Sequence, residues 1–496
     1  MRNKRPSRVI WVFCNTQSRS ARDQAQTFQL LFTIMKIDVL IIGGGPGGAA
    51  AAMFLLREGI TPVILEQEEF PRFHIGESLT GESAQVLRRL GLGEKMDEME
   101  NPIKHGVRVY GTNAATTWYV KVSSRDADWK LYDNTTWQVR RSEFDKMMLE
   151  EAIKRGAKIL RGTAIKALQG EDGALVGIRI RHPNGEEEDI STKVVLDCSG
   201  QSTFLANQKV TGPKYMGSYD KQVAFFTHVR GAIRGSGTSG EEAKDNTLIL
   251  YDKKFHWAWF IPIDKEVVSL GMVTPRAKFL EKKQTPEEYF RSEVYKINPE
   301  IGRRVPKLDL VEKVHVIPNY SFQVRGFCGK GFICIGDSHR FIDPIFSFGV
   351  TVTMREAEFA APIVRQFLEG KLDGKENPFE EHQMACEKGI DNLEDMIDLF
   401  WEQPFAFATF VHSRYVEQMT DAFAGRIYEF EHQPSQSILS FRKLLKRTRE
   451  YDADDYSIPI GSRYHPERAP LWAPDSPVPG TEEWIARGQQ RESVSA

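Results

Sequence analysis

A glycine-rich turn between an apolar run and a helix-like run constrains this chain more than any other feature. Residues 43–48 read Gly-Gly-Gly-Pro-Gly-Gly, after the mostly apolar residues 37–42 and before the helix-like residues 49–57. In such a strand–turn–helix unit, glycines permit the tight turn, the approach of a pyrophosphate and close packing of the helix on the strand. The N–H groups that begin the helix then face the phosphates, so the turn predicts a bound dinucleotide. The residues expected to contact it are Gly43, Gly45, Pro46, Gly47, Gly48 and Ala49.

Three further strand-like runs define the dinucleotide more closely. The first ends at Glu66, about 18 residues past the loop, where an acidic side chain accepts hydrogen bonds from a ribose diol. Residues 194–200 form a buried strand that runs into Asp-Cys-Ser-Gly. A later strand ends in Gly336 and Asp337, in a position to hold the other end of an extended dinucleotide. These features favour FAD over NAD.

The glycine loop, the Asp-Cys-Ser-Gly strand and the Gly-Asp strand together resemble the FAD-dependent monooxygenase-like oxidoreductases. The resemblance implies that Asp337 contacts the ribityl chain of FAD. Residues 139–145 are similar to a stretch typical of that group, which implies that Arg141 lies near the flavin. The other interpretation of Arg141 is a surface arginine at a helix start. The expected fold is α/β, with a Rossmann-like FAD-binding domain of the flavin monooxygenase (glutathione-reductase-like) type, an interleaved β-sheet substrate domain and a helical C-terminal region.

A tryptophan pair indicates what kind of flavin chemistry is expected. Residues 257–262 read Trp-Ala-Trp-Phe-Ile-Pro and alternate as a strand does, and the polar residues 252–254 before them suggest a hairpin. Two aromatics on one strand face can simply fill a core. Downstream of an FAD loop, however, the motif resembles the signature of the flavin-dependent halogenases. That resemblance implies that Trp257 and Trp259 lie beside the flavin and keep organic substrate away from it.

The halogenase resemblance requires a catalytic lysine, and Lys104 stands in the expected place. It follows a Gly-Glu-Ser segment, residues 76–78, and an amphipathic stretch, residues 82–99, and it precedes the strand-like residues 106–111. The resemblance implies that Lys104 receives the activated halogen. Taken alone, Lys104 reads as an exposed lysine that enters a strand, because lysines are rarely buried.

The third element of the resemblance is residues 343–350, Asp-Pro-Ile-Phe-Ser-Phe-Gly-Val, which run into a helix. The resemblance implies that backbone N–H groups of Phe348 and Gly349 hold a halide, for the reason that helix N-termini bind anions. Phe348 replaces the usual Ser or Thr, and its ring could narrow the pocket. Phe346 stands where tryptophan halogenases carry Glu, so the chain is more similar to the phenol and pyrrole branch.

The function implied is halogenation of an electron-rich phenolic or pyrrolic substrate, a reaction of secondary metabolism that consumes FADH2, O2 and chloride or bromide. Hypohalous acid would form at the flavin and travel to Lys104. The substrate would be a small aromatic molecule, free or tethered to a carrier protein. No second nucleotide loop is present, which favours a separate NAD(P)H-dependent flavin reductase as the partner. The alternative is an FAD-dependent aromatic hydroxylase or oxidoreductase on the same fold.

Composition excludes other classes of protein. A formal net charge of −2 shows no excess of basic residues of the kind that binds nucleic acid. The five cysteines show no metal-ligand spacing, so no metal site is expected and they read as reduced thiols of a cytoplasmic protein. No apolar run reaches the roughly 18 residues that span a bilayer.

The chain is expected to divide into four parts. Residues 1–34 read as a disordered or mis-annotated leader, and residues 464–496 as an extended, proline-containing tail. Between them, residues 35–370 would form the FAD-binding domain interleaved with the substrate sheet, which is assigned to residues 101–135 and 209–325. Residues 371–463 would form the helical C-terminal region.

Overall fold

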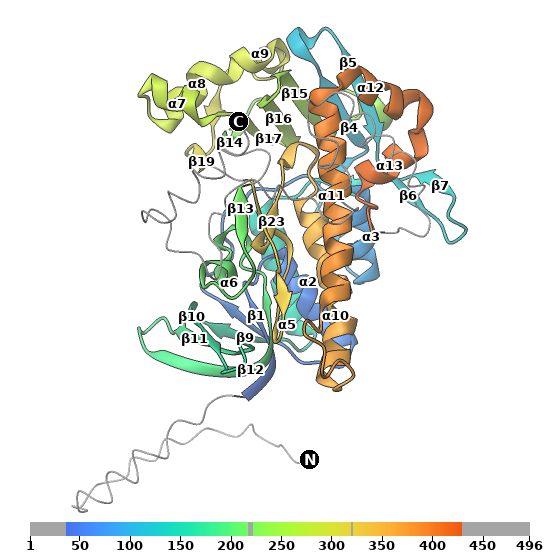
Figure 1. The fold of residues 1–496 in the computed structure, drawn as a ribbon. Coiled ribbons are helices and arrows are strands. Elements are labelled where there is room, and N and C mark those ends of the chain that lie inside the picture. The colour runs from blue at the N-terminus through green and yellow to red at the C-terminus, as the bar shows by residue number, and fades with distance from the viewer. Residues whose placement is uncertain (1–35, 217–221, 319–320, 429–496) are drawn as a thin grey trace, which may run out of the picture.

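The computed structural model describes residues 36–216, 222–318 and 321–428. The expected leader and tail, and residues 429–463 of the expected helical region, lie outside these described residues. Figure 1 shows two β-sheets, one at each end of the molecule, with long helices running along the space between them. The fold class expected from the sequence, a mixed α/β flavoprotein fold, is confirmed.

The first sheet is built around β1 (Lys36–Ile42), whose aliphatic residues Val39 to Ile41 are fully buried. β1 pairs in parallel with β2 (Val63–Glu66) on one side and with β12 (Glu187–Asp197) on the other. β22 (Phe332–Cys334) is parallel to the end of β12, so the late Gly-Asp turn leaves the sheet at the same edge as the glycine turn. The sheet is completed, in the order β10-β11-β12-β1-β2-β9, by β9 (Lys158–Arg161), β10 (Thr163–Gln169) and β11 (Leu175–Arg181).

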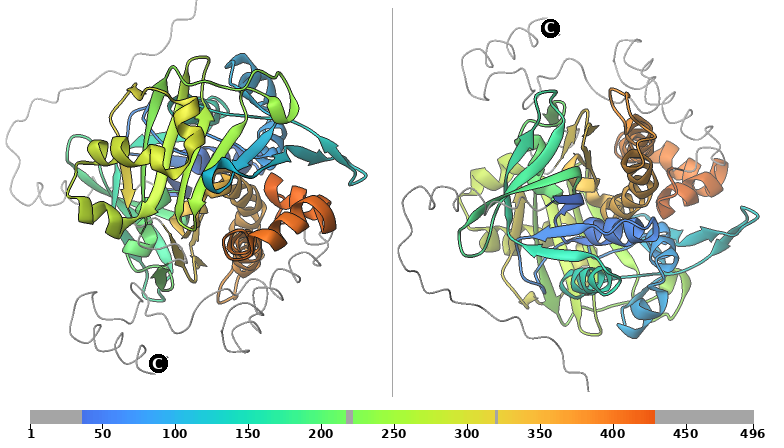
Figure 2. Two further views of the ribbon diagram at one scale, coloured as in Figure 1. Left: turned by 90° about the horizontal axis from the view of Figure 1, so that it is seen from above. Right: turned by 90° about the horizontal axis from the view of Figure 1, so that it is seen from below.

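Helices cover the first sheet and bury its aliphatic strands. α2 (Pro46–Arg57) begins directly after the glycine turn and packs against α5 (Arg141–Lys154) and α10 (Gly349–Leu368). The view from below in Figure 2 shows α2 and α10 side by side. Two short helices, α3 (Gly81–Arg89) and α4 (Gly93–Glu98), form from the amphipathic stretch.

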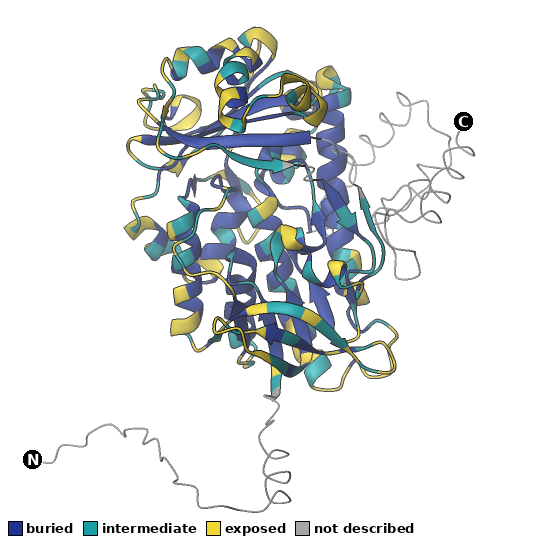
Figure 3. Ribbon diagram, turned by 90° about the vertical axis from the view of Figure 1, so that its left-hand side faces the viewer, coloured by how far each residue is buried: buried dark blue, intermediate teal, exposed yellow. Residues whose placement is uncertain are grey.

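The second sheet carries the tryptophan strand in its middle. Its strand order is β18-β14-β17-β16-β15-β4-β5. Its main strands are β4 (Gly106–Tyr110), β5 (Thr117–Lys121), β14 (Gln222–Arg230), β15 (Thr247–Lys253), β16 (His256–Pro262) and β17 (Val267–Pro275), and β18 (Asp309–Leu310) and β19 (His315–Pro318) pair with β14. The expected hairpin is confirmed, because β15 and β16 are antiparallel neighbours. Figure 3 shows buried residues along the central strands, and exposed residues on the outer helices and on the outermost strands of the first sheet.

The two faces of the second sheet pack against different partners. Ala258 and Phe260 join a core with α8 (Pro286–Ile297) and α9 (Pro299–Arg304) on the outer face. Trp257, Trp259 and Ile261 point the other way, toward the core shared with the C-terminal helices. The alternation predicted for this strand is therefore confirmed.

The helix expected after residues 343–350 is present, and the described part of the chain from residue 380 to residue 424 is mostly helical. After α10 come α11 (Glu380–Glu402), α12 (Pro404–Thr409), a π-helix (Phe410–Arg414) and α13 (Val416–Ala424). Phe400 and Phe407 are buried in the core below the tryptophan strand, whereas Phe405 is 90% exposed. In the described part of the chain, no helix is both long enough and apolar enough to cross a membrane.

Candidate functional site

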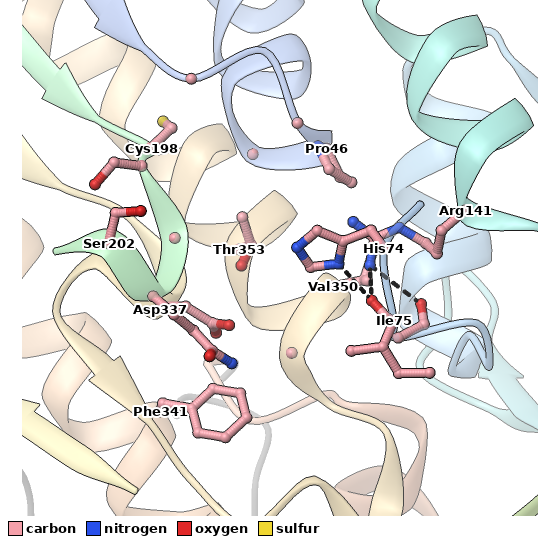
Figure 4. A pocket seen from close by; sticks show the side chains of 18 of the residues that line it. Pro46, His74, Ile75, Arg141, Cys198, Ser202, Asp337, Phe341, Val350 and Thr353 are labelled. Carbon is pink, nitrogen blue, oxygen red and sulfur yellow. Dashed lines mark hydrogen bonds between the residues drawn. The ribbon is translucent and has the colours of Figure 1, made fainter. Parts of the chain in front are cut away.

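A cavity of about 530 Å³ runs from the glycine turn to the tryptophan strand. Its wall includes Gly45 of the glycine turn, Asp337 and Trp257 of the tryptophan strand, and therefore draws on both sheets. Figure 4 shows Arg141 and His74 on one side of the space and Asp337 and Phe341 on the other. An extended dinucleotide that lies along this cavity would place its phosphates at the glycine turn and its other end near the tryptophans.

The glycine turn has the backbone geometry that a pyrophosphate site requires. Gly43 has a φ of +98°, and a Cβ at this position would lie 2.5 Å from the carbonyl oxygen of Cys198. A Cβ on Gly48 would lie 1.9 Å from the carbonyl oxygen of Gly43, so only glycine lets α2 approach the turn. Gly43, Gly45, Pro46 and Gly47 line the cavity, whereas Gly48 and Ala49 lie behind its wall.

Glu66 lines the cavity and also fixes the glycine turn. Its Oε2 accepts a hydrogen bond from the backbone N–H of Gly44 at 2.6 Å, and its Oε1 accepts one from Glu68 at 2.7 Å. Each carboxylate oxygen retains a lone pair, which a ribose diol could use. The residues of this end of the cavity therefore fit the adenosine half of FAD.

Asp337 and Arg141 line the cavity from opposite sides. Burial raises the pKa of Asp337 to about 7, against the opposing effect of the Arg141 charge. Arg141 is buried at the start of α5, so its interpretation as a surface residue is wrong. Its guanidinium donates two hydrogen bonds to Asp145, at 2.6 and 2.9 Å, and another to the carbonyl of Ile75. These bonds hold the charge in a fixed place beside the cavity (Figure 4). Gly336 lies behind Asp337 and donates its N–H to Glu356 at 2.6 Å.

Both tryptophans of β16 line the cavity. Their ring centroids are 5.7 Å apart, and Trp259 Nε1 donates a hydrogen bond to Ser269 at 3.1 Å. A Cβ on Gly271 of β17 would lie 2.1 Å from the Trp259 ring, so this glycine provides the space for the indole. Trp257 Nε1 is buried and has no hydrogen-bond partner among the described residues. The pair gives this end of the cavity a rigid aromatic wall.

Lys104 lies just behind the cavity wall. It belongs to β3 (Ile103–Lys104), which pairs with β8 (Thr136–Trp137), and it is only 2% exposed. Its Nζ donates hydrogen bonds to Ser78 Oγ and to the carbonyl oxygen of Leu79, both at 2.9 Å. Burial lowers the pKa of Lys104 to about 7. The interpretation of Lys104 as an exposed lysine is therefore wrong.

The turn before α10 presents its backbone to the cavity. Ser347, which has a φ of +65°, and Gly349 line the space, while Phe348 does not. The Phe348 ring is buried in the aromatic core, 6.4 Å from the ring of Phe346. Narrowing of the pocket by this ring, which the sequence suggested, is therefore not observed. The N–H groups of Phe348 and Gly349 lie at the helix start, where they have no partner within the helix.

Sequence reasoning missed the hydroxyl groups between Lys104 and the cavity. Ser78 and Thr247 both line the cavity, and their hydroxyl oxygens are 2.7 Å apart. Gln138 Nε2 donates to Thr247 Oγ1 at 2.8 Å. The Gly-Glu-Ser segment, which contains Ser78, served only to locate Lys104, and no sequence signal pointed to Thr247 or Gln138.

Comparison with known proteins agrees with this geometry. Residues 36–375 match the family model of the FAD binding domain. The chain is 35% identical, over 75% of its length and 87% of the relative's, to the 1H-pyrrole-2-carbonyl-(peptidyl-carrier protein) brominase of Pseudoalteromonas luteoviolacea. It is 27% identical, over 79% of its length and 89% of the relative's, to the corresponding chlorinase of Pseudomonas fluorescens.

Solved structures place the fold in the same group. The flavin-dependent brominase Bmp2 superposes with a TM-score of 0.74 at 32% identity, and the match covers 83% of this chain and 99% of that one. Such enzymes use FAD as cofactor and halide and O2 as co-substrates. The resemblance that the sequence motifs suggested is thus confirmed, and this chain belongs to the flavin-dependent halogenases, FAD-binding enzymes of the oxidoreductase type.

Proposed function

We propose that this enzyme uses FADH2, O2 and halide to halogenate an electron-rich aromatic ring, and that Lys104 carries the halogen as a neutral amine. Bound reduced FAD supplies the electrons that convert O2 and halide into hypohalous acid. The backbone N–H groups of Phe348 and Gly349 hold the halide beside the cavity. Trp257 and Trp259 exclude organic substrate and water from that space, which keeps the oxidant from leaking.

The hydrogen bonds of Lys104 are the observation that supports its role. A neutral amine has two N–H donors and one lone pair, and Ser78 Oγ and the Leu79 carbonyl accept both donors. An ammonium group would have a third N–H, and no third acceptor is present among the described residues. With a pKa of about 7, much of the lysine is neutral at physiological pH. The lone pair is then available to attack hypohalous acid, with loss of water and formation of an N–halogen bond.

The activities of two relatives support a substrate class for this enzyme. Both act on a pyrrole-2-carbonyl group attached to a peptidyl-carrier protein. We therefore propose a pyrrolic or phenolic ring as the acceptor, with a carrier-bound pyrrole as the first candidate. A separate NAD(P)H-dependent flavin reductase would supply FADH2, because the sequence has no second nucleotide loop.

Rapid mixing tests the halogenation chemistry without knowledge of the substrate. Protein that holds reduced FAD is mixed with oxygenated buffer, with or without bromide, in the presence of taurine as a soluble amine. We expect bromide to speed the return of the flavin to its oxidised spectrum and taurine bromamine to accumulate. If halide does not change the rate at which the flavin returns to its oxidised spectrum, and no bromamine forms, the hydroxylase alternative would be favoured.

A further inference from the structure

Glu77 directly precedes Ser78, yet its side chain enters a separate group of titratable residues in the cavity wall. The residue lines the cavity and is only 1% exposed. Its Oε1 lies 2.7 Å from Nε2 of His228, whereas its Oε2 is buried without a hydrogen-bond partner among the described residues. A buried carboxylate oxygen without a partner is costly, so its presence in a cavity wall calls for a reason.

His228 links Glu77 to a second carboxylate. It lies on β14, and its Nδ1 is 2.7 Å from Glu312 Oε1. Glu312 Oε1 has no hydrogen-bond partner among the described residues, so this contact is a close approach of the two groups and not a hydrogen bond. The hydroxyl of Thr227 donates to the Glu312 carbonyl at 2.9 Å and holds this loop against the strand. Each nitrogen of one imidazole thus faces a different carboxylate.

The outer end of this group reaches solvent. The Glu312 side chain is 26% exposed, and its Oε2 lies 3.3 Å from Nε2 of His315. The His315 side chain is 20% exposed, and its ring stacks on Phe73 at a centroid distance of 3.9 Å. Phe73 also lies against His228, with ring centroids 5.4 Å apart, and lines the cavity. The titratable groups that face His228 are therefore Glu77 on the cavity side and Glu312, with His315 behind it, on the solvent side.

We propose that Glu312, His228 and Glu77 form a proton path from solvent to the flavin cavity. A proton that arrives at Glu312 passes to Nδ1 of His228, while the proton on Nε2 passes to Oε1 of Glu77. Glu77 then releases a proton into the cavity. The transfer exchanges the imidazole tautomer, and rotation of the ring or a second exchange of protons resets it.

The chemistry of the proposed function, on which this inference rests, requires such a path. In the overall reaction FADH2, O2, halide, the aromatic C–H compound and one proton give FAD, the aryl halide and two water molecules. One proton per turnover must therefore come from outside the reactants. A path through the wall delivers protons without admitting water, which would compete for the oxidant.

The alternative is that Glu312, His228 and Glu77 only stabilise the structure of the cavity wall. A buried histidine between two carboxylates is weak evidence of a stabilising role, because desolvation offsets any attraction. A bracing role needs no change of protonation at Glu77 or His228 when the flavin changes its redox state. The two roles can therefore be separated by measuring protonation directly.

Infrared difference spectroscopy of the FAD-bound protein makes that measurement. Bound FAD is photoreduced with EDTA as the electron donor, without halide or aromatic substrate, and the carboxylic-acid C=O region and the imidazole bands are recorded. The variants are Glu77→Gln, His228→Gln and Glu312→Gln. His182→Gln is the matched control, because His182 Nε2 faces Glu188 at 2.9 Å outside the cavity wall.

The path predicts a carboxylic-acid band on flavin reduction that is lost in Glu77→Gln, altered in His228→Gln and unchanged in His182→Gln. Identical difference bands in all variants would overturn it. In rapid-mixing experiments, His228→Ala should return to oxidised FAD roughly ten- to a hundredfold more slowly, and free imidazole should restore the rate. Glu312→Gln, at a partly exposed position, provides the test if the buried variants do not fold. Because the infrared experiment needs only bound FAD, it remains decisive if halogenation is not observed.

Discussion

Lys104 Nζ donates a hydrogen bond to Ser78 Oγ at 2.9 Å, and of these two residues only Ser78 lines the flavin cavity. A single hydroxyl group thus separates the proposed halogen acceptor from the space where the oxidant would form. The same hydroxyl lies 2.7 Å from Thr247, so a buried hydrogen-bonded group fixes its position. This arrangement fixes the direction in which the amine points.

Ser78→Ala should reduce halogen transfer while leaving FAD binding intact. The change removes one of the two acceptors of Lys104 and leaves Thr247 without its Ser78 partner, at a cost of about 1–3 kcal/mol. We expect product formation to fall about tenfold, with wild-type yield of taurine bromamine. Ser124→Ala, which removes a buried hydroxyl bonded to Gln85 and Asn134, is the control. Equal losses in both variants would show that Ser78 has no special part in transfer.

Lys104→Met should change the pH dependence of stability. The pKa of Lys104 is about 7 in the folded protein and 10.5 ordinarily. Between pH 7 and pH 10.5 this lysine therefore holds a proton in the unfolded chain that it lacks in the folded protein. Wild-type stability therefore rises with pH from about 7 upward, and the lysine penalty is largest below pH 7. The free energy of unfolding of the variant minus that of wild type should be about 2–3 kcal/mol larger at pH 6 than at pH 9. Denaturant titrations at both pH values measure this, and a pH-independent difference would refute the shifted pKa.

Gly45→Ala and Gly48→Ala should both lose FAD binding, but for different reasons. At Gly45 the added methyl would meet only Arg72 Nη2, at 3.4 Å, so the apoprotein should fold, but the methyl would block the pyrophosphate. At Gly48 it would overlap the carbonyl oxygen of Gly43, and the strand–turn–helix unit could not close. Thermal unfolding and FAD titration should show near-normal stability without binding in the first variant, and a large loss of stability in the second. A Gly45→Ala protein that binds FAD normally would contradict the assignment of this turn.

Gly349→Ala tests the halide site without disturbing the fold. A Cβ at this helix start has open space around it, with Asp337 Oδ1 nearest at 4.0 Å, so the methyl would project into the cavity. We expect stability to be kept and the bromide concentration for half-maximal bromamine formation to rise about tenfold, or about 1.4 kcal/mol. Gly302→Ala on α9, away from the cavity, is the matched helical control. Unchanged bromide dependence would place the halide elsewhere.

The sequence predicted those parts of the site that depend on neighbours along the chain. The glycine turn and the alternation of Trp257 and Trp259 follow from local backbone geometry and strand period, and both appear as expected. The environment of Lys104 could not be predicted, because it depends on residues brought together by the fold. Ser78 is 26 residues from Lys104, and Thr247 is 169 residues from Ser78.

The direction of a side chain was the other property that could not be predicted from the sequence. Phe348 stands in the halide motif, and its ring could have pointed into the cavity or away from it. The ring packs in the aromatic core under β16, which includes Phe346 and Phe400, and stays out of the cavity, which Ser347 and Gly349 line. Packing between distant helices and strands decides that outcome.

Labelling with ³⁶Cl-chloride tests the role of Lys104 most directly. Wild type and Lys104→Met are each turned over with FADH2 and O2 in labelled chloride, without aromatic substrate, and are then desalted. We predict that wild type retains thiol-releasable label on the protein, whereas Lys104→Met retains none although added taurine still collects chloramine at the wild-type rate. Equal, thiol-releasable label on both proteins would contradict the account.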